Sequence, residues 1–432
     1  MTGPMKVQNS NDDDSHEGTE STRRSFASHT PKWQRFQTSV LLASMKTSEA
    51  STNTIYQRQY SHVYANRLNE LKKRFPQKRS NVTHCDRILD LVEDEPSYVV
   101  GTLVKESGTE DVVDKNSKCR PDDVLVLEDD SGRVYLQTER AQEYCTGAVV
   151  AVQGVVKEGG RMHVDKFDHP IPPAAFPLPD NGPSTENQGQ QDPHILLLSG
   201  LSCGNPEASM IQRDMLLAYV QGYLSPTASK VCRIIIAGDS IYNGEVEGAK
   251  QLDSFVVQLC SSGIPVDILP GNKDPTTANW PQRPLHSSLL PQAEVYGSKL
   301  LAKTPNPYAS LIGSQYVMGT DGRNVEDMLQ FVRSPSGGEL AELEVLQRTL
   351  DWCHMCPTGP DSVPTMPHAE SDPMIIANQP AVYFSGGCTK FDTKMTSGTR
   401  MVCIPKFSKT GEAVLVNMTS LACELLRFDD AA

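Results

Sequence analysis

The chain has 432 residues, a formal net charge of −13 at pH 7 and a pI near 5.3. Its length is enough for two or three domains with a sizeable core. Its acidity argues against a surface that binds DNA by phosphate neutralisation alone, because that mode needs clustered Lys and Arg. The 11 cysteines are scattered singly, which favours a reducing compartment over a disulfide framework. Neither a signal peptide nor a membrane span is indicated, so we expect an intracellular protein with no membrane partner.

The N-terminal part of the chain changes character near residue 50. Residues 1–50 are rich in Ser, Thr, Asn and Asp and lack periodicity, which predicts a disordered tail. Apolar and aromatic residues then recur at helical spacing, among them Tyr60, Leu68 and Leu71. We therefore expect an N-terminal helical segment over 51–96 whose aromatic face docks on its own protein.

Residues 97–168 contain five short β-rich segments separated by turns. This pattern predicts a small Greek-key barrel of the OB type. Such barrels bind single-stranded nucleic acid when they carry aromatic platforms and a basic groove. This one offers Tyr98, Tyr135 and Tyr144 among many acidic residues. We therefore expect the barrel to dock on protein, with direct DNA contact at most weak.

A Pro-rich and then polar stretch, 169–193, is predicted to be an interdomain linker. Beyond it, apolar strands alternate with helical patterns through residues 194–432. Such alternation predicts a parallel or mixed sheet that is buried on both faces. The fold class expected is a multidomain α+β and α/β chain, with an OB-type β-barrel followed by an α/β sandwich.

Three apolar strands of this last region each run directly into a loop. They read ILLLSGLSCG (195–204), RIIIAGDSIYNG (233–244) and PVDILPGNKD (265–274). These segments resemble the calcineurin-like phosphoesterases, whose loops read D-x-H, G-D-x-x-D and G-N-H-[DE]. Against that pattern, Gly200 and Ser202 replace the first Asp and His. Asp239 matches the bridging Asp of the second loop, and Tyr242 stands where its last Asp belongs.

The third loop keeps Asn272 at the position of the Asn ligand and has Lys273 in place of the general-acid His. Asp274 matches the acidic residue that mostly supports this loop in the family. A late G-H-x-H element is expected near 385–389, where the chain has no histidine. Two remaining ligands do not hold two divalent ions. We therefore expect no catalytic residue, no metal site and no cofactor, and Lys273 is a candidate to pair with Asp239 or Asp274.

A second candidate metal motif is Cys353-His354-Met355-Cys356, with His368 further along the chain. The C-x-x-C spacing is that of a half zinc site. A structural zinc ion takes four ligands, and no second C-x-x-C or H-x-x-x-H pattern follows. We therefore favour a chance spacing.

The stretch PGNKDPTTANWPQRPLHSSLLP (270–291) resembles the family of eukaryotic DNA polymerase delta small (B) subunits. Collinear similarity continues through TPNPY, GTDGRNVEDM and VNMTSLAC, and reaches back to RQYSHVYANRL and YVVGTLVKE, so it covers roughly 55–430. Residues 271–274, GNKD, depart from the family. The resemblance implies a helical segment, an OB domain and an inactivated calcineurin-like phosphodiesterase domain.

The resemblance also implies a role and partners. It implies a nuclear, non-catalytic accessory subunit of replicative DNA polymerase delta. Such a subunit bridges the cysteine-rich C-terminal domain of the catalytic subunit to a third subunit, which contacts the sliding clamp. The alternative is a metal-dependent nuclease or phosphodiesterase with a relic active site, and the number of surviving ligands favours the scaffold.

Overall fold

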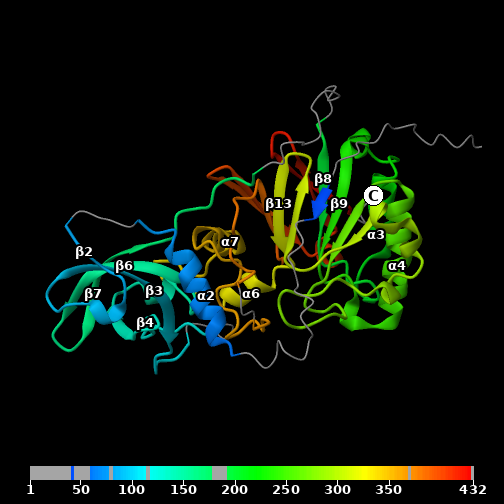
Figure 1. Cartoon of the computed structure of the whole chain (residues 1–432). Helices are drawn as coiled ribbons and strands as arrows, with labels where there is room; N and C mark the ends of the chain where they lie inside the picture. Colours follow the sequence, from blue (N-terminus) through cyan, green and yellow to red (C-terminus); the bar gives the residue numbers. More distant parts are fainter. Residues whose placement is uncertain are drawn as a thin grey trace, which may run out of the picture. The chain divides into compact units, whose positions relative to one another are not determined.

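The computed structural model describes residues 40–42, 59–76, 81–112, 117–177, 192–367 and 371–429. Three six-stranded sheets make up its frame. One sheet forms a barrel from residues 83–168, and the other two form a sandwich from residues 194–427 together with the short strand 40–42 (Figure 1). No helix among the described residues is long and apolar enough to cross a membrane.

The barrel is closed by pairing between strands β3 and β6. Its strand order is β2-β3-β4-β5-β7-β6, with β3 also antiparallel to β6. Helix α2 (Ser61–Lys72) packs on β3 and β6. The order and closure are those of a five-stranded Greek-key barrel with one added short strand. The strands are β2 (Thr83–Cys85), β3 (Pro96–Glu106), β4 (Val124–Glu128), β5 (Arg133–Gln137), β6 (Val149–Lys157) and β7 (Arg161–Asp168).

The sandwich places two mixed sheets face to face. The first has the order β1-β12-β13-β14-β16-β15, and the second has the order β11-β10-β9-β8-β17-β18. In the first sheet the strands are β1 (Val40–Leu42), β12 (Tyr308–Ile312), β13 (Gln315–Thr320), β14 (Val382–Cys388), β15 (Asp392–Thr396) and β16 (Thr399–Pro405). In the second they are β8 (His194–Leu198), β9 (Val231–Ala237), β10 (Val266–Leu269), β11 (Leu301–Lys303), β17 (Glu412–Asn417) and β18 (Cys423–Arg427).

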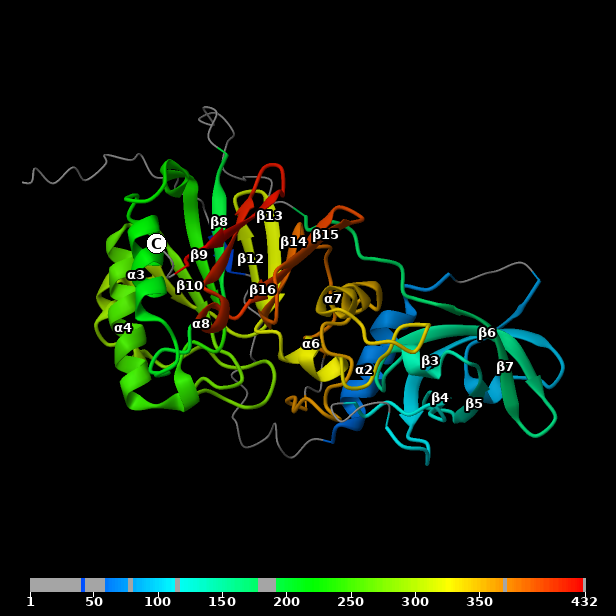
Figure 2. The same cartoon turned by 180° about the vertical axis from the view of Figure 1, so that it is seen from behind.

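Helices cover the outer face of each sheet, so the strands are buried on both sides. Helices α3 (Met210–Val220) and α4 (Val246–Ser261) lie outside the second sheet. Helix α7 (Glu342–Asp351) packs on β16, beside α6 (Arg323–Met328) (Figure 2). Two short helices, α5 (Gly297–Leu300) and α8 (Phe407–Thr410), stand in connections. The observed fold confirms the predicted OB-type barrel beside an α/β sandwich.

Alternation along the strands explains why these runs are apolar throughout. In β8, Ile195 and Leu197 point into the layer between the two sheets, whereas Leu196 and Leu198 point toward α3 and α4. A third apolar cluster runs without a break from the barrel interior through α6 and α7 to the outer face of the first sheet. The barrel and the sandwich therefore share one core.

The structure differs from the expected organisation at two short strands. Strand β1 pairs with β12, although its residues fall in the segment predicted to be a disordered tail. The other residues of 1–50 lie outside the described part of the chain. Strand β2 joins the barrel by pairing with β3, although 51–96 was predicted to be helical. Three-residue strands carry too little periodicity to be recognised in a sequence. The remaining domain boundaries stay predictions.

Candidate functional site

A small pocket of about 110 Å³ lies where the carboxyl ends of β9, β10 and β13 meet. This edge is where an α/β sheet normally carries its site. Of the residues singled out in the sequence, Asp239, Asn272 and Lys273 line it. The other lining residues are Asp321, Gly322, Arg323, Glu326, Gly387 and Lys406. The charged side chains are thus three acidic and three basic, which differs from the acid- and histidine-rich lining that divalent metals require.

Asp239 is held in a strained conformation at the end of β9. Its φ is +51°, which is uncommon for a residue with a side chain. Its Oδ1 accepts a hydrogen bond from the backbone amide of Lys273 at 3.0 Å. Lys273 therefore meets Asp239 through its main chain. Among the described residues, its ammonium group forms no ion pair, so the expected pairing of Lys273 with Asp239 or Asp274 is wrong.

Asp274 organises the loops from beneath the pocket. Its carboxylate accepts hydrogen bonds from the amides of Gly271 at 2.7 Å, Ile241 at 2.8 Å and Ser240 at 3.2 Å. Burial and the nearby charge of Asp239 raise the pKa of Asp274 to about 7, against the effect of these bonds. One buried carboxyl thereby fixes two of the three loops relative to each other.

Ser202 and Tyr242, where the calcineurin-like pattern has a His and an Asp, contact the neighbouring loops through their backbone amides. The amide of Ser202 donates to the carbonyl of Asp239 at 3.0 Å, and the amide of Tyr242 donates to that of Cys203 at 2.9 Å. Neither residue lines the pocket. Both loops therefore keep their backbone connections without a ligand at these positions.

Lys406 stands close to the position that the missing first Asp would occupy. A Cβ atom added to Gly200 would meet Cβ of Lys406 at 3.1 Å and its Cα at 3.2 Å. Gly200 also has a φ of +63°, where any side chain is strained. The half-buried Lys406 follows β16 and brings a positive charge into the pocket. A carboxylate side chain at residue 200 would therefore be strained and would require Lys406 to shift.

Asp321 is the buried acid that the sequence analysis missed. It follows β13 and is only 7% exposed. Its oxygens accept from the amides of Asn272 at 3.1 Å and Arg323 at 3.3 Å. Burial and the charge of Asp239 raise its pKa to about 7. Asp321 directly follows the buried strand β13, and Lys406 directly follows β16. This position in the sequence could have indicated that both residues lie at the site.

The residues present do not fit a pair of divalent ions. Among the described residues, no group of three or more His, Cys, Asp or Glu side chains is placed to hold a metal ion. The pocket offers two aspartates, one of which has its pKa raised to about 7 and is partly protonated at neutral pH. Three cationic side chains share the same small space. We derive no metal-dependent step from this site.

His354, within the C-x-x-C motif, forms hydrogen bonds inside the protein through both of its ring nitrogens. Nε2 of His354 lies 2.9 Å from Asp372 Oδ2, and its Nδ1 accepts from the amide of Cys356 at 3.2 Å. Burial and the charge of Arg67 lower the pKa of His354 to about 4. Both ring nitrogens are engaged, so this histidine has no lone pair free for a metal. His368 lies outside the described residues.

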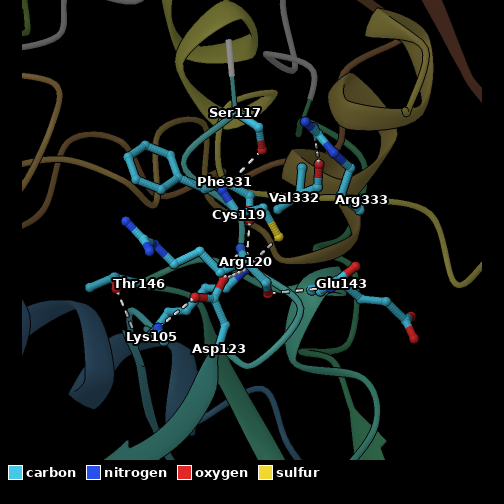
Figure 3. Close-up of polar contacts among 12 residues, drawn as sticks. Lys105, Ser117, Cys119, Arg120, Asp123, Glu143, Thr146, Phe331, Val332 and Arg333 are labelled. Carbon is cyan, nitrogen blue, oxygen red and sulfur yellow. Dashed lines mark hydrogen bonds and ion pairs between the residues drawn. The ribbon is translucent and has the colours of Figure 1, made fainter. Parts of the chain in front are cut away.

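A second site, which the sequence did not suggest, is the junction between barrel and sandwich (Figure 3). At its centre the buried ammonium of Lys105, on β3, donates to the carbonyl of Phe331 at 2.8 Å. It also lies 3.3 Å from Asp123 Oδ2 and 3.3 Å from Cys119 Sγ. The amide of Lys118 donates to the carbonyl of Gln330 at 2.7 Å. The loop between β3 and β4 is thereby fixed to the segment that follows α6.

Arg67 of α2 joins the same two bodies from another side and is 1% exposed. Its Nε donates to Asp372 Oδ2 at 2.8 Å, and its Nη2 donates to the carbonyl of Gly359 at 2.7 Å. Its Nη1 donates to the carbonyls of Pro357 at 2.9 Å and Gly147 at 3.3 Å. Burial works to raise the pKa of Asp372, but the charges of His354 and Arg67 outweigh it and hold that pKa well below its usual range.

Comparisons with known proteins agree with this two-part structure. Residues 59–167 match the family model for the DNA polymerase delta subunit OB-fold domain, and residues 195–393 match that for the DNA polymerase alpha/epsilon B subunit. The chain is 31% identical over 416 residues to the DNA polymerase delta small subunit of Oryza sativa subsp. japonica, covering 86% of this chain and 93% of that protein. It is 31% identical over 417 residues to that of Arabidopsis thaliana, covering 86% of this chain and 91% of that protein.

Among solved structures, TT1561 of Thermus thermophilus is 14% identical and covers 55% of this chain and 99% of its own, with a TM-score of 0.30. A score this low adds nothing to the assignment, which depends on the sequence relatives and the family models.

Proposed function

Because the chain belongs to the family of DNA polymerase delta small subunits, we propose that it is a non-catalytic scaffold of a replicative DNA polymerase. In this role it connects the cysteine-rich C-terminal domain of the catalytic subunit with a third subunit that contacts the sliding clamp. It acts in the nucleus, in DNA replication and repair synthesis. The family resemblance identified in the sequence supports these partners.

The observation that carries the non-catalytic proposal is the lining of the relic pocket. Lys406 lies beside Gly200, at the position where the calcineurin-like phosphoesterases have an Asp ligand. Lys273 and Arg323 add two further cations to the pocket. A two-metal phosphoesterase needs a carboxylate that bridges the two ions, a full set of ligands for both ions and a proton donor for the leaving group. The shared apolar core and the buried polar junction support a rigid body that presents surfaces to partners.

The first experiment tests for hydrolysis. The purified full chain is incubated with Mn²⁺ and an oligonucleotide labelled at its 3′ end, and separately with a simple phosphodiester. We expect no turnover above that of the Asp239→Asn and Asn272→Ala variants. Metal-dependent turnover that both substitutions abolish would refute the scaffold proposal and favour the nuclease alternative.

The second experiment tests the partner. The full chain is co-expressed with the cysteine-rich C-terminal domain of a polymerase delta catalytic subunit, and we expect the two to co-purify in a defined ratio. A folded chain that leaves this domain unbound would show that the proposed partner is wrong, whatever the outcome of the hydrolysis assay.

A further inference from the structure

A second groove, of about 560 Å³, lies between α2 and the barrel. One wall is the side of α2 that carries Tyr64, Ala65 and Leu68. The opposite wall comes from β3 and the end of β4, and Asp361 of the sandwich closes one side. Its volume lies in the range of sites that enclose several side chains of a ligand. We call it the acidic groove.

The floor and rim of the acidic groove differ in chemistry. Ala65 and Leu68 on one wall and Val104 on the other form the apolar lining, which we call the floor. The charged side chains that line it are all carboxylates, from Glu128, Asp129, Asp130 and Asp361, and no Lys, Arg or His is among the lining residues. Hydrophobic contact combined with charge of a single sign selects an oppositely charged, amphipathic ligand.

Two of these acids are already used within the protein. Asp129 accepts from the amides of Ile88, Ser131 and Gly132, and Glu128 pairs with Arg133 at 2.9 Å.

The other two acids remain available to a ligand. Asp130 is exposed and has no ion-pair partner among the described residues, and Asp361 is exposed with the hydroxyl of Tyr64 as its partner. The groove therefore presents two carboxylates from two different parts of the fold.

We propose that the acidic groove is a docking site for a polypeptide segment of a partner protein that carries Lys or Arg beside small apolar residues. The ammonium or guanidinium groups pair with Asp130 and Asp361, while the apolar residues cover the floor at Ala65. Carboxylates repel phosphates, so the groove does not suit nucleic acid. The inference goes beyond the scaffold role, because it names a surface and the chemistry of its ligand and is tested on the isolated chain.

The test measures fluorescence anisotropy with the full chain and two short labelled peptides at low ionic strength. One peptide consists of Ala-Leu-Lys repeats, and the other has Glu in place of Lys. We expect only the Lys peptide to bind. The double variant Asp130→Lys/Asp361→Lys should weaken its binding about tenfold or more, because two charge contacts become repulsive.

Two controls separate the groove from the general acidity of the chain. Glu158→Lys/Asp165→Lys makes the same change in net charge at exposed barrel residues that do not line the groove, and binding should change less than twofold. Ala65→Phe fills the groove without changing charge, and it should weaken binding several-fold. Unfolding midpoints confirm that each variant is folded. An equal loss in the Glu158/Asp165 variant, or unchanged binding to Ala65→Phe, would overturn the proposal.

Discussion

Replacing Arg67 by Met removes a buried cation and leaves the aliphatic stem of the side chain in place. Arg67 makes four hydrogen bonds at the junction, one to the carboxylate of Asp372 and three to backbone carbonyls. We expect these acceptors to stay buried when the guanidinium is lost, because Arg67 and Asp372 are almost fully buried in the native chain. Asp372 keeps only His354 as a side-chain partner.

The expected cost is large compared with the stability of a typical domain. Breaking one side of a buried ion pair destabilises a protein by about 3–5 kcal/mol. Total stabilities are roughly 5–15 kcal/mol, so Arg67→Met should lower the urea midpoint severely. The matched control is Arg87→Met, which removes an exposed pair with Asp90 at 2.8 Å. Such pairs contribute about 0–1 kcal/mol.

The result that would refute this reasoning is a loss of stability in Arg67→Met no greater than in Arg87→Met. A second readout is specific to the electrostatics. The charge of Arg67 lowers the pKa of His354, so a folded variant should show a higher imidazole pKa than the value of about 4 in the native chain. Proton NMR of the His ring across pH 3 to 7 measures this directly.

Three further substitutions test the junction and the relic pocket. Gly147→Ala should cost at least about 2 kcal/mol more than Gly159→Ala in urea unfolding, because both have positive φ but only the first places Cβ against a carbonyl, at 2.0 Å. In Asp321→Asn, urea unfolding at several pH values should show a flatter pH dependence. The native carboxyl keeps its proton up to about pH 7 but loses it near 3.8 when unfolded, so it destabilises the fold by a few kcal/mol as pH rises between these values. Gly200→Asp/Ser202→His should gain no thermal stabilisation from Mn²⁺; a clear rise in Tm would contradict the steric argument.

The sequence predicted those features that depend on periodicity and on motif position. Short β-rich segments separated by turns predicted the barrel, and continuous apolar runs that alternate with helical patterns predicted the buried strands of the sandwich. The structure brings Asp239 and Asn272 to the same pocket, because the carboxyl ends of neighbouring parallel strands share one edge of a sheet. The resemblance to DNA polymerase delta small subunits is confirmed by the comparisons.

What the sequence did not predict depends on contacts between distant residues. Arg67 and Asp372 are separated by 305 positions, and Lys105 and Phe331 by 226. Arg, Asp and Lys usually lie at the surface, so only the packing of the barrel against the sandwich shows that the side chains of Arg67, Asp372 and Lys105 are buried. The role of Asp321 likewise depends on its contact with the amide of Asn272, 49 positions earlier in the chain.

The loops around the small pocket keep their shape because carboxylates that accept hydrogen bonds from backbone amides hold them. Asp274 accepts hydrogen bonds from two amides of the loop after β9 and from one amide of the loop after β10. Asp239 and Asp321 each accept a hydrogen bond from another amide of the loop after β10. In an enzyme the same carboxylates would be oriented by bound ions as well. Here Lys406 lies beside Gly200 and adds a positive charge to the pocket, and burial raises the pKa of Asp274 and of Asp321 to about 7. The chain's own hydrogen bonds thereby hold the loops at this edge of the sheet without a bound ion.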